Sequence, residues 1–153
     1  MLRDVSEVST IMIACRKEDA LAAVWEIKNI EKTEVKADVV EVHKESDKAG
    51  FYDVRGHFAG IPWHNRFSYE LNDKGFHSLE TNPPASGPRI QGGFIVDEIG
   101  EHACKITHYE QYVLPKWAVP LKPLVQMYLR WSMRKELMDL REMILADADK
   151  DLA

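Results

Sequence analysis

Three residues with acid–base side chains alternate along one short segment in the second half of the chain. His108, Glu110 and Tyr112 are each separated by a single residue within the segment from Ala103 to Val113. Alternate side chains of a β-strand point to the same face, so this spacing predicts that the three project together. A histidine, a carboxyl group and a phenol on one face could supply a general acid, a general base and hydrogen-bond donors. They are the candidate catalytic residues.

The environment of these three side chains depends on which face of the strand they share. If Lys105 points to solvent, the alternation places Ile106 and the three acid–base residues in the interior. Burial would then disfavour the charged forms of His108 and Glu110, unless the two pair with each other. If the phase of the strand is reversed, both side chains lie in water and have no special role. The sequence leaves both interpretations open.

Further segments share the alternation and the β-branched or aromatic content typical of strands. The predicted strands are Val5–Ala14, Val39–Glu45, Phe51–Phe58, Trp63–Leu71, Phe76–Thr81, Ile90–Ile99 and Ala103–Val113. Their short connections favour antiparallel pairing, and Gly92-Gly93 predicts a bulge or bend in the sixth strand. Lys17–Ile27 has the pattern of a helix, Asn29–Glu34 that of a second short helix or turn, and the proline-rich segment from Asn82 to Pro88 that of a loop.

The turn at Ala59-Gly60-Ile61-Pro62 fixes how the third and fourth strands pair. A turn centred on Gly60-Ile61 predicts that paired residue numbers sum to 121, so that Phe58 faces Trp63 and Tyr52 faces Tyr69. The aromatic side chains then lie on one face and the charged ones on the other, as in a sheet with one buried face. Two consequences of this register are that Arg55 faces Arg66 and His57 faces His64.

A single long helix is predicted from Trp117 to Ala148. Its first half is apolar almost all round, and its second half narrows to a stripe at Met133, Leu137, Leu140 and Ile144. Such spacing places the stripe on one helical face, and the wide apolar half needs a concave apolar partner. The predicted fold is therefore α+β, with a curved seven-stranded antiparallel sheet wrapped round a long C-terminal helix and two short helices after the first strand.

A group of mainly aromatic and apolar side chains is expected to line a cavity between the sheet and this helix. Apolar walls with a few polar groups are typical of small-molecule sites, and Asn65 supplies a polar group near the turn at Gly60. The candidate ligand-binding residues are Tyr52, Val54, Phe58, Trp63, Asn65, Phe67, Tyr69, Phe94, Ile106, Trp117, Leu121, Leu124, Val125 and Tyr128.

The composition is that of one globular domain, residues 1–153 with a core of about 5–146. A net charge of −5 speaks against nucleic acid as a partner. No apolar run is long enough to span a membrane, and we expect a cytoplasmic protein. Cys15 and Cys104 lack the spacing of a redox or zinc motif, and two histidines, His57 and His64, without a third ligand make a poor metal site. We expect no metal and no cofactor, and the oligomeric state stays open.

The order of these elements resembles that of the START-like (SRPBCC) superfamily. The residues that carry the resemblance are the strand Val8–Ala14, the pair Val24-Trp25 in the first helix, Gly93-Phe94, the strand Cys104–Thr107 that leads to Leu114-Pro115, and the long last helix. The resemblance implies a helix-grip fold with an internal apolar cavity. One departure is the segment Lys28–Thr33, where many relatives have an acidic residue followed by tryptophan and this chain has no aromatic residue.

Three functions are consistent with these features. The resemblance implies binding of a hydrophobic small molecule, in the class of lipids, isoprenoid quinones or polyketides. A second hypothesis is a cyclase or dehydratase of polyketide-like substrates that uses His108, Glu110 and Tyr112 in the cavity. A third is a co-regulator that docks on another protein and has a collapsed cavity. No GxSxG, P-loop, GxGxxG or HExxH motif occurs, so hydrolase, nucleotide-binding and zinc-protease functions lack support.

Overall fold

The computed structural model describes residues 3–81 and 89–152, and the predicted loop from Asn82 to Pro88 lies outside them. The order of its elements confirms the predicted α+β fold. In chain order they are β1 (Asp4–Ile13), α1 (Lys17–Trp25), the 3-10 helix η1 (Ile27–Asn29), α2 (Ile30–Thr33), β2 (Ala37–Lys44), β3 (Ala49–Phe58), β4 (Ile61–Asn72), β5 (Gly75–Glu80), β6 (Arg89–Gly100), β7 (Ala103–Val113), the 3-10 helix η2 (Lys116–Leu121) and α3 (Lys122–Leu152).

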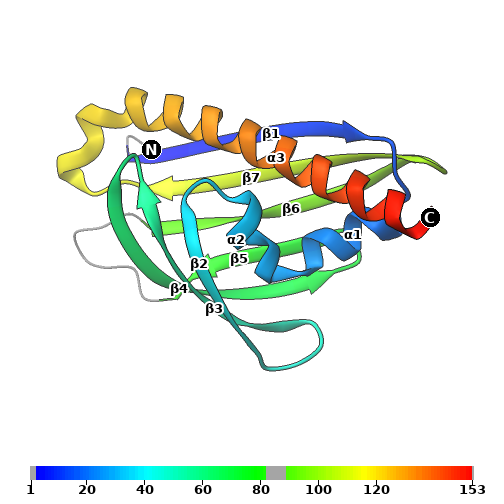
Figure 1. The fold of residues 1–153 in the computed structure, drawn as a ribbon. Helices are drawn as coiled ribbons and strands as arrows, with labels where there is room; N and C mark the ends of the chain where they lie inside the picture. Colours follow the sequence, from blue (N-terminus) through cyan, green and yellow to red (C-terminus); the bar gives the residue numbers. More distant parts are fainter. Residues whose placement is uncertain (1–2, 82–88, 153) are drawn as a thin grey trace.

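The seven strands form one sheet in the order β1-β7-β6-β5-β4-β3-β2. All six neighbouring pairs are antiparallel, because β2 to β7 follow one another in the sheet as they do in sequence and β1 pairs with β7. The sheet is strongly curved, and α3 runs along its concave side together with the short helices α1 and α2 (Figure 1). This is the predicted helix-grip arrangement, in which the space between α3 and the sheet becomes the interior of the protein.

The pairing of β3 with β4 differs from the predicted register. Paired residue numbers sum to 119, so Phe58 faces Ile61 and Tyr52 faces Phe67. The reason lies in the turn, where Ala59 and Gly60 both have positive φ, 50° and 86°. Two such residues make the tight two-residue turn whose twist suits a hairpin. The shift by two residues keeps every side chain on its predicted face.

The corrected register also removes two predicted contacts between like groups. Arg66 pairs with Asp53 instead of Arg55, and its Nε lies 2.8 Å from the Asp53 carboxylate. His57 does not face His64, and its Nδ1 lies 2.7 Å from a carboxylate oxygen of Asp38 on the neighbouring strand. The charged face of the hairpin is therefore electrostatically complementary, where the expected register would have opposed two arginines.

Of the bulge or bend predicted at the glycine pair in β6, the structure excludes the bulge. Gly92 and Gly93 keep a regular register with both β5 and β7, and the irregularity of β6 lies at Glu98–Gly100. These two positions need glycine for a different reason, because the backbones of the neighbouring strands approach them too closely for a side chain. A Cβ on Gly93 would lie 2.1 Å from the carbonyl oxygen of Phe76, and a Cβ on Gly92 would lie 2.6 Å from that of Tyr109.

The core face of α3 matches the predicted stripe. Leu129, Met133, Leu137, Leu140 and Ile144 are all buried. The sequence also predicted that a concave apolar partner encloses the first half of this helix, and that prediction is wrong. The residues of that half on the opposite side of the helix face solvent, because the sheet reaches only one side of α3. Among the described helices, none is both long and apolar enough to cross a membrane.

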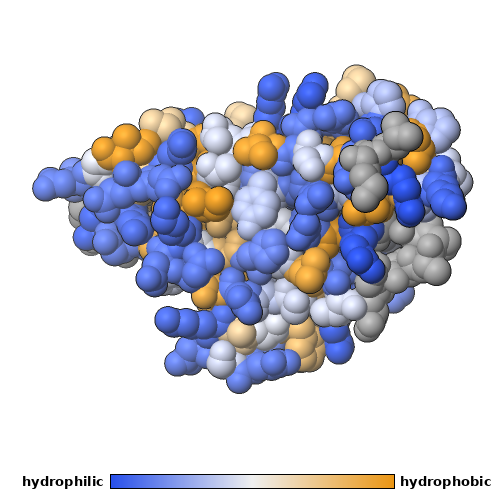
Figure 2. All heavy atoms as spheres, turned by 180° about the vertical axis from the view of Figure 1, so that it is seen from behind, coloured by the Kyte–Doolittle hydropathy of each residue, from blue (hydrophilic) through white to orange (hydrophobic). Residues whose placement is uncertain are grey.

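The convex side of the sheet is mostly hydrophilic. Figure 2 shows this side, on which apolar side chains are scattered singly among polar ones. Several of these polar groups are paired, such as Arg66 with Asp53 and His57 with Asp38. The two faces of the sheet therefore differ in character, as expected for an antiparallel sheet that packs a core on one side.

Candidate functional site

The phase of β7 confirms that its acid–base residues face the interior. Cys104, Ile106, His108, Glu110 and Tyr112 are all buried, while the residues between them are only half-buried. The inner face of this strand therefore changes along its length. It is apolar at Cys104 and Ile106, and it carries three polar groups from His108 onward.

Lys36 stands at the centre of a cluster of charged side chains on this inner face. It precedes β2 directly and is only 2 % exposed. Its Nζ lies 2.5 Å from Glu34 Oε1, 2.7 Å from Glu136 Oε1 and 3.5 Å from Glu110 Oε1. It also donates a hydrogen bond to Ser132 Oγ at 3.3 Å. One buried ammonium group thus connects the α2–β2 segment, β7 and α3.

His108 completes this cluster from the sheet side. Its Nδ1 donates to the carbonyl oxygen of Gly93 at 2.9 Å, because a carbonyl can only accept. The ring is stacked on Phe94 with centroids 4.2 Å apart. These two contacts fix the ring so that Nε2 faces two carboxylates, at 3.2 Å from Glu136 and 3.5 Å from Glu110.

The protonation states in the cluster follow from burial and from pairing. Burial alone would lower the pKa of His108, but the hydrogen bonds and charges of Glu110 and Glu136 outweigh it and raise that pKa to about 10. Burial likewise opposes the charge of Lys36, whose pKa is nevertheless raised by Glu110, Glu34 and Glu136. The alternative in which His108 pairs with Glu110 is therefore the one that the structure shows, and His108 is a cation at neutral pH.

The two remaining carboxyl groups behave in opposite ways. Burial would raise the pKa of Glu136, but Lys36 and His108 overcome it and hold the pKa at about 2. Burial and the charge of Glu136 raise the pKa of Glu34 well above its usual range. Glu136 is thus ionised at neutral pH, while the shift of Glu34 favours its protonated form. Tyr112 donates a hydrogen bond to Glu110 at 3.4 Å and orients that carboxyl group.

A cavity of about 70 Å³ adjoins the charged cluster. Its wall is aromatic on the side of β3, β4 and β5 and polar on the side of β7 and of the segment between α2 and β2. It is lined by Ile30, Glu34, Lys36, Ala37, Tyr52, Val54, Trp63, Phe67, Phe76, Ser78, Ile90, Gln91, Gly92, Gly93, Phe94, His108, Glu110 and Tyr112. This volume holds about two water molecules, so the hollow is much smaller than the sequence led us to expect.

One donor in this wall has no partner. The indole Nε1 of Trp63 is buried and makes no hydrogen bond with the part of the chain that the structure describes. A buried N–H group without an acceptor is destabilising, so its presence beside a cavity favours an acceptor supplied by a guest molecule. The aromatic wall and the polar cluster thus both present groups that a small molecule could engage.

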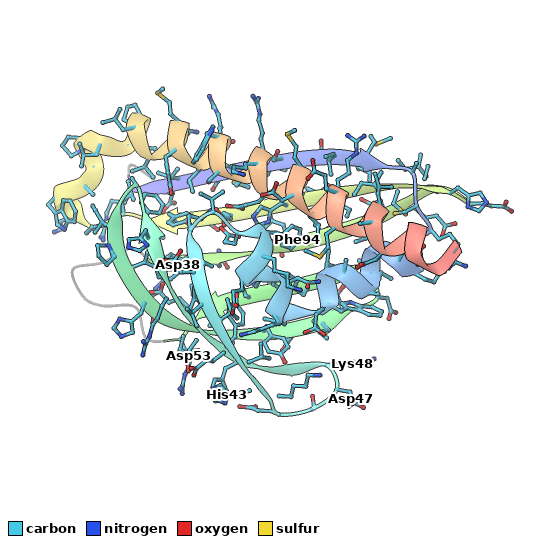
Figure 3. All side chains as sticks on the ribbon, viewed as in Figure 1. Asp38, His43, Asp47, Lys48, Asp53 and Phe94 are labelled. Carbon is cyan, nitrogen blue, oxygen red and sulfur yellow. The ribbon has the colours of Figure 1, made fainter. Side chains whose placement is uncertain are left out.

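The structure brings together only some of the residues predicted to bind a ligand. Five of them line the cavity together with the three predicted catalytic residues: Tyr52, Val54, Trp63, Phe67 and Phe94. Tyr69 and Ile106 are buried in the apolar core outside the cavity. Asn65 is not among the lining residues, and its Oδ1 accepts a hydrogen bond from the backbone N–H of Arg66. Figure 3 shows Phe94 beneath α3, on the inner side of the sheet.

The predicted residues from the chain around α3 lie elsewhere. Phe58 and Val125 are half-buried beside a second core cluster, and Tyr128 contacts Phe58 with ring centroids 4.7 Å apart. Trp117, Leu121 and Leu124 are exposed, so they do not line the cavity. The prediction for these last three is wrong because they lie on the side of the helix that the sheet does not cover.

Sequence reasoning missed Glu34, Lys36 and Glu136. Glu136 had a signal, because it lies three residues after Met133 and four before Leu140, on the buried face of α3. A charged residue at such a position indicates a buried partner. Glu34 and Lys36 lie in a short irregular segment between α2 and β2, where no periodicity predicts the direction of a side chain.

The same cluster has the composition of a metal site. Ligand atoms of Glu34, His108, Glu110 and Glu136 all lie within 4.8 Å of one another. The Lys36 ammonium group, however, already contacts three of these carboxyl groups and takes the place of a cation. A second group, Glu41, His43 and Asp53, lies outside the interior on the β2–β3 hairpin (Figure 3). There Asp53 is bound by Arg66.

Comparison with solved structures identifies the fold. The protein TTHA0849 from Thermus thermophilus superposes with a TM-score of 0.80 at 16% identity, covering 94% of this chain and 99% of that one. The Zhui aromatase/cyclase from Streptomyces sp. R1128 gives 0.73 at 8% identity, covering 98% and 96%. A START superfamily protein from Mycobacterium smegmatis gives 0.75 at 10% identity, covering 92% and 97%. No family model and no curated protein sequence matches the chain.

Proposed function

We propose that this chain, which has the START-like helix-grip fold, binds a hydrophobic small molecule of the lipid, isoprenoid quinone or polyketide-like class between the sheet and α3. The observation that carries the proposal is the cluster of ionisable groups at one end of an aromatic-walled cavity. Each buried charge costs several kcal/mol of desolvation. A core built only for stability would place apolar side chains there, so we infer that the cluster serves a ligand.

The wall and the cluster set the chemistry of this ligand. The aromatic side of the cavity favours an apolar ring or chain. The polar side is ionic, with His108 held by Glu110 and Glu136, and Trp63 adds an unpartnered N–H. This indole N–H suits a carbonyl or hydroxyl oxygen at one end of the ligand. A ligand larger than the cavity requires the half-buried side chains of Trp63 and Ile90 to move outward.

Native mass spectrometry of the protein as purified tests this proposal. We expect a bound small apolar molecule that is released on denaturation, or uptake of one of three probes: palmitate, a short-chain ubiquinone or a flavonoid. Val54→Phe fills the cavity with a ring and should abolish uptake. Val42→Phe, on β2 and outside the cavity lining, should keep it. A wild-type protein that carries nothing and takes up none of the probes contradicts the proposal.

A second candidate function is an acid–base enzyme of the cyclase or dehydratase type. The observation that favours it is the buried acid–base group on β7, in which His108 Nε2 lies 3.5 Å from Glu110 and Tyr112 donates a hydrogen bond to Glu110 at 3.4 Å. His108 Nε2–H would exchange its contacts with Glu136 and Glu110 for a carbonyl oxygen of the substrate, and Glu110 would accept a proton from the adjacent carbon. Among the neighbours, an aromatase/cyclase shares the fold, and a shared fold alone does not imply shared chemistry.

Turnover of a probe distinguishes an enzyme from a protein that only binds and carries its ligand. With a linear poly-β-ketone probe, we expect cyclised or dehydrated product, and Glu110→Gln should slow its formation by about 10²–10⁴-fold while leaving probe binding in place. If the probe is bound and released unchanged by the wild-type protein, the enzymatic candidate is wrong and carriage remains.

A further inference from the structure

Among the described residues, the fold leaves an apolar surface of η2 and α3 uncovered. This surface, the η2–α3 patch, consists of Trp117, Leu121, Leu124, Met127 and Trp131, and all five side chains are exposed. Leu124, Met127 and Trp131 are 63 %, 65 % and 55 % exposed, which is unusual for large apolar residues in adjacent turns. The patch begins in η2 and continues along the first half of α3.

Helix geometry explains why folding cannot bury these residues. Leu124, Met127 and Trp131 are spaced three and four apart and therefore share one face of α3. The buried Leu129 and Met133 occupy the opposite face, which packs on the sheet. Turning the patch inward would expose that core, so both faces stay apolar. The convex side of the sheet, by contrast, carries only scattered apolar side chains (Figure 2).

The charges of the segment that carries the patch are all of one sign. From Lys116 to Lys135 the chain has five basic residues and no Asp or Glu: Lys116, Lys122, Arg130, Arg134 and Lys135. Arg130 pairs with Glu7 of β1 and Lys135 with Asp139 of α3, so the expected attraction for anions comes mainly from the other three. The whole chain has a net charge of −5, and the second half of α3 is acidic. Tryptophan, leucine and methionine flanked by basic residues are typical of helices that lie on anionic lipid.

We propose that the η2–α3 patch docks on the surface of an anionic lipid bilayer. The apolar side chains enter the boundary between headgroups and acyl chains, and the flanking lysine and arginine side chains contact the lipid phosphates. Two tryptophans at this depth act as interfacial anchors. Docking in this way needs no ligand in the cavity, and so it stands independently of the function proposed above.

A row of aromatic rings connects this surface with the cavity. Trp131 contacts Tyr128 at 5.9 Å between ring centroids, Tyr128 contacts Phe58 at 4.7 Å, and Phe58 contacts Tyr112 at 5.9 Å. Tyr112 is part of the cavity wall. A bilayer under the patch would therefore lie at the outer end of an aromatic row whose inner end is the cavity.

Co-sedimentation with lipid vesicles tests the docking. We expect the full-length protein to bind phosphatidylcholine vesicles that contain about 30% phosphatidylglycerol at least about tenfold more tightly than pure phosphatidylcholine, with loss of the difference in high salt. Leu124→Glu should weaken binding to the anionic vesicles by about tenfold or more. Ile99→Glu is the matched control, because Ile99 is also exposed but lies at the end of β6.

Three results would overturn the proposal. One is no binding to anionic vesicles, and another is equal weakening by Leu124→Glu and Ile99→Glu. The third is a dimer in sedimentation equilibrium that Leu124→Glu dissociates, without any vesicle binding, which would assign the patch to a second copy of the chain. Since no cargo is added in these measurements, none of these results bears on ligand binding in the cavity.

Discussion

Neighbouring turns of α3 face two different interiors. Toward the C-terminus, Leu137, Leu140 and Ile144 pack in a fully apolar core. One turn earlier, Ser132 and Glu136 meet the buried Lys36. The helix face is the same and both regions exclude water, yet only one of them carries charge. The difference indicates that the apolar end stabilises the fold, while the charged region is kept at a cost in free energy for another purpose.

Removing one charge from the cluster should give the largest effect. Glu136→Ala removes a carboxylate that contacts both the ammonium group of Lys36 and the imidazolium of His108, and both cations stay buried. We expect the free energy of unfolding to fall by about 4 kcal/mol. Chemical denaturation measures it. The matched double variant Lys36→Met/Glu136→Leu removes the central pair together and should recover most of the loss, and a double variant as unstable as the single one would contradict this account.

Truncating a side chain at the apolar end of α3 should lower the free energy of unfolding somewhat less than Glu136→Ala does. It should leave the charged region unaffected. Leu137→Ala removes a fully buried side chain, and we expect a loss of about 3 kcal/mol from the lost burial and the cavity that remains. The pH dependence of stability should stay that of the wild type. A change in that pH dependence would show that the two regions are not separable.

The two regions should also differ in their response to pH. The pKa of His108 is raised from 6.5 to about 10, so its stabilisation is complete below about pH 6.5 and is lost as the pH rises through 10. Between pH 7 and pH 9 we expect the wild type to lose about 2 kcal/mol from this group. The stability of His108→Phe should not show this loss between pH 7 and pH 9. Equal slopes in denaturation series of the two proteins would contradict a cationic His108.

The acid side of the pH profile has the opposite sign. The pKa of Glu136 is lowered to about 2, so its stabilisation is present above the usual glutamate pKa and is lost as the pH falls through 2. Together the two groups predict maximal stability between about pH 4.5 and pH 6.5.

The smallest expected effect concerns a buried carboxyl group outside the cluster. Burial raises the pKa of Glu80 to about 7, although Asn65 and Arg89 oppose the shift. Ionisation of Glu80 above its usual pKa therefore destabilises the fold. We expect Glu80→Gln to raise the free energy of unfolding relative to the wild type, and this gain should be about 1 kcal/mol larger at pH 8 than at pH 5. A thermal denaturation series measures it, and a gain that does not change with pH would contradict the raised pKa.

The sequence predicted the apolar end better than the charged one. The stripe on α3 and the alternation of β7 each have one strong period, and the structure confirms both. The register of β3 with β4 was missed by two residues, because the positive φ of Ala59 is not visible from its residue type. Lys36 was missed because a lysine is almost always exposed, and only the three-dimensional approach of α3 and β7 supplies its carboxylate partners.

The prediction that the first half of α3 is enclosed was wrong for a related reason. Periodicity indicates which residues can be buried, but the extent of the sheet determines which of them are buried. Trp117 and Leu124 have the residue types of a core and lie where no strand covers them.

A crystal structure of the protein as purified tests the central claim most directly. We expect electron density for a non-protein molecule in the cavity between Trp63 and Phe94. One of its oxygen atoms should lie within about 3 Å of the indole nitrogen of Trp63. An interior that holds only ordered water, with the cluster unchanged by soaking in palmitate, a short-chain ubiquinone or a flavonoid, would contradict the claim.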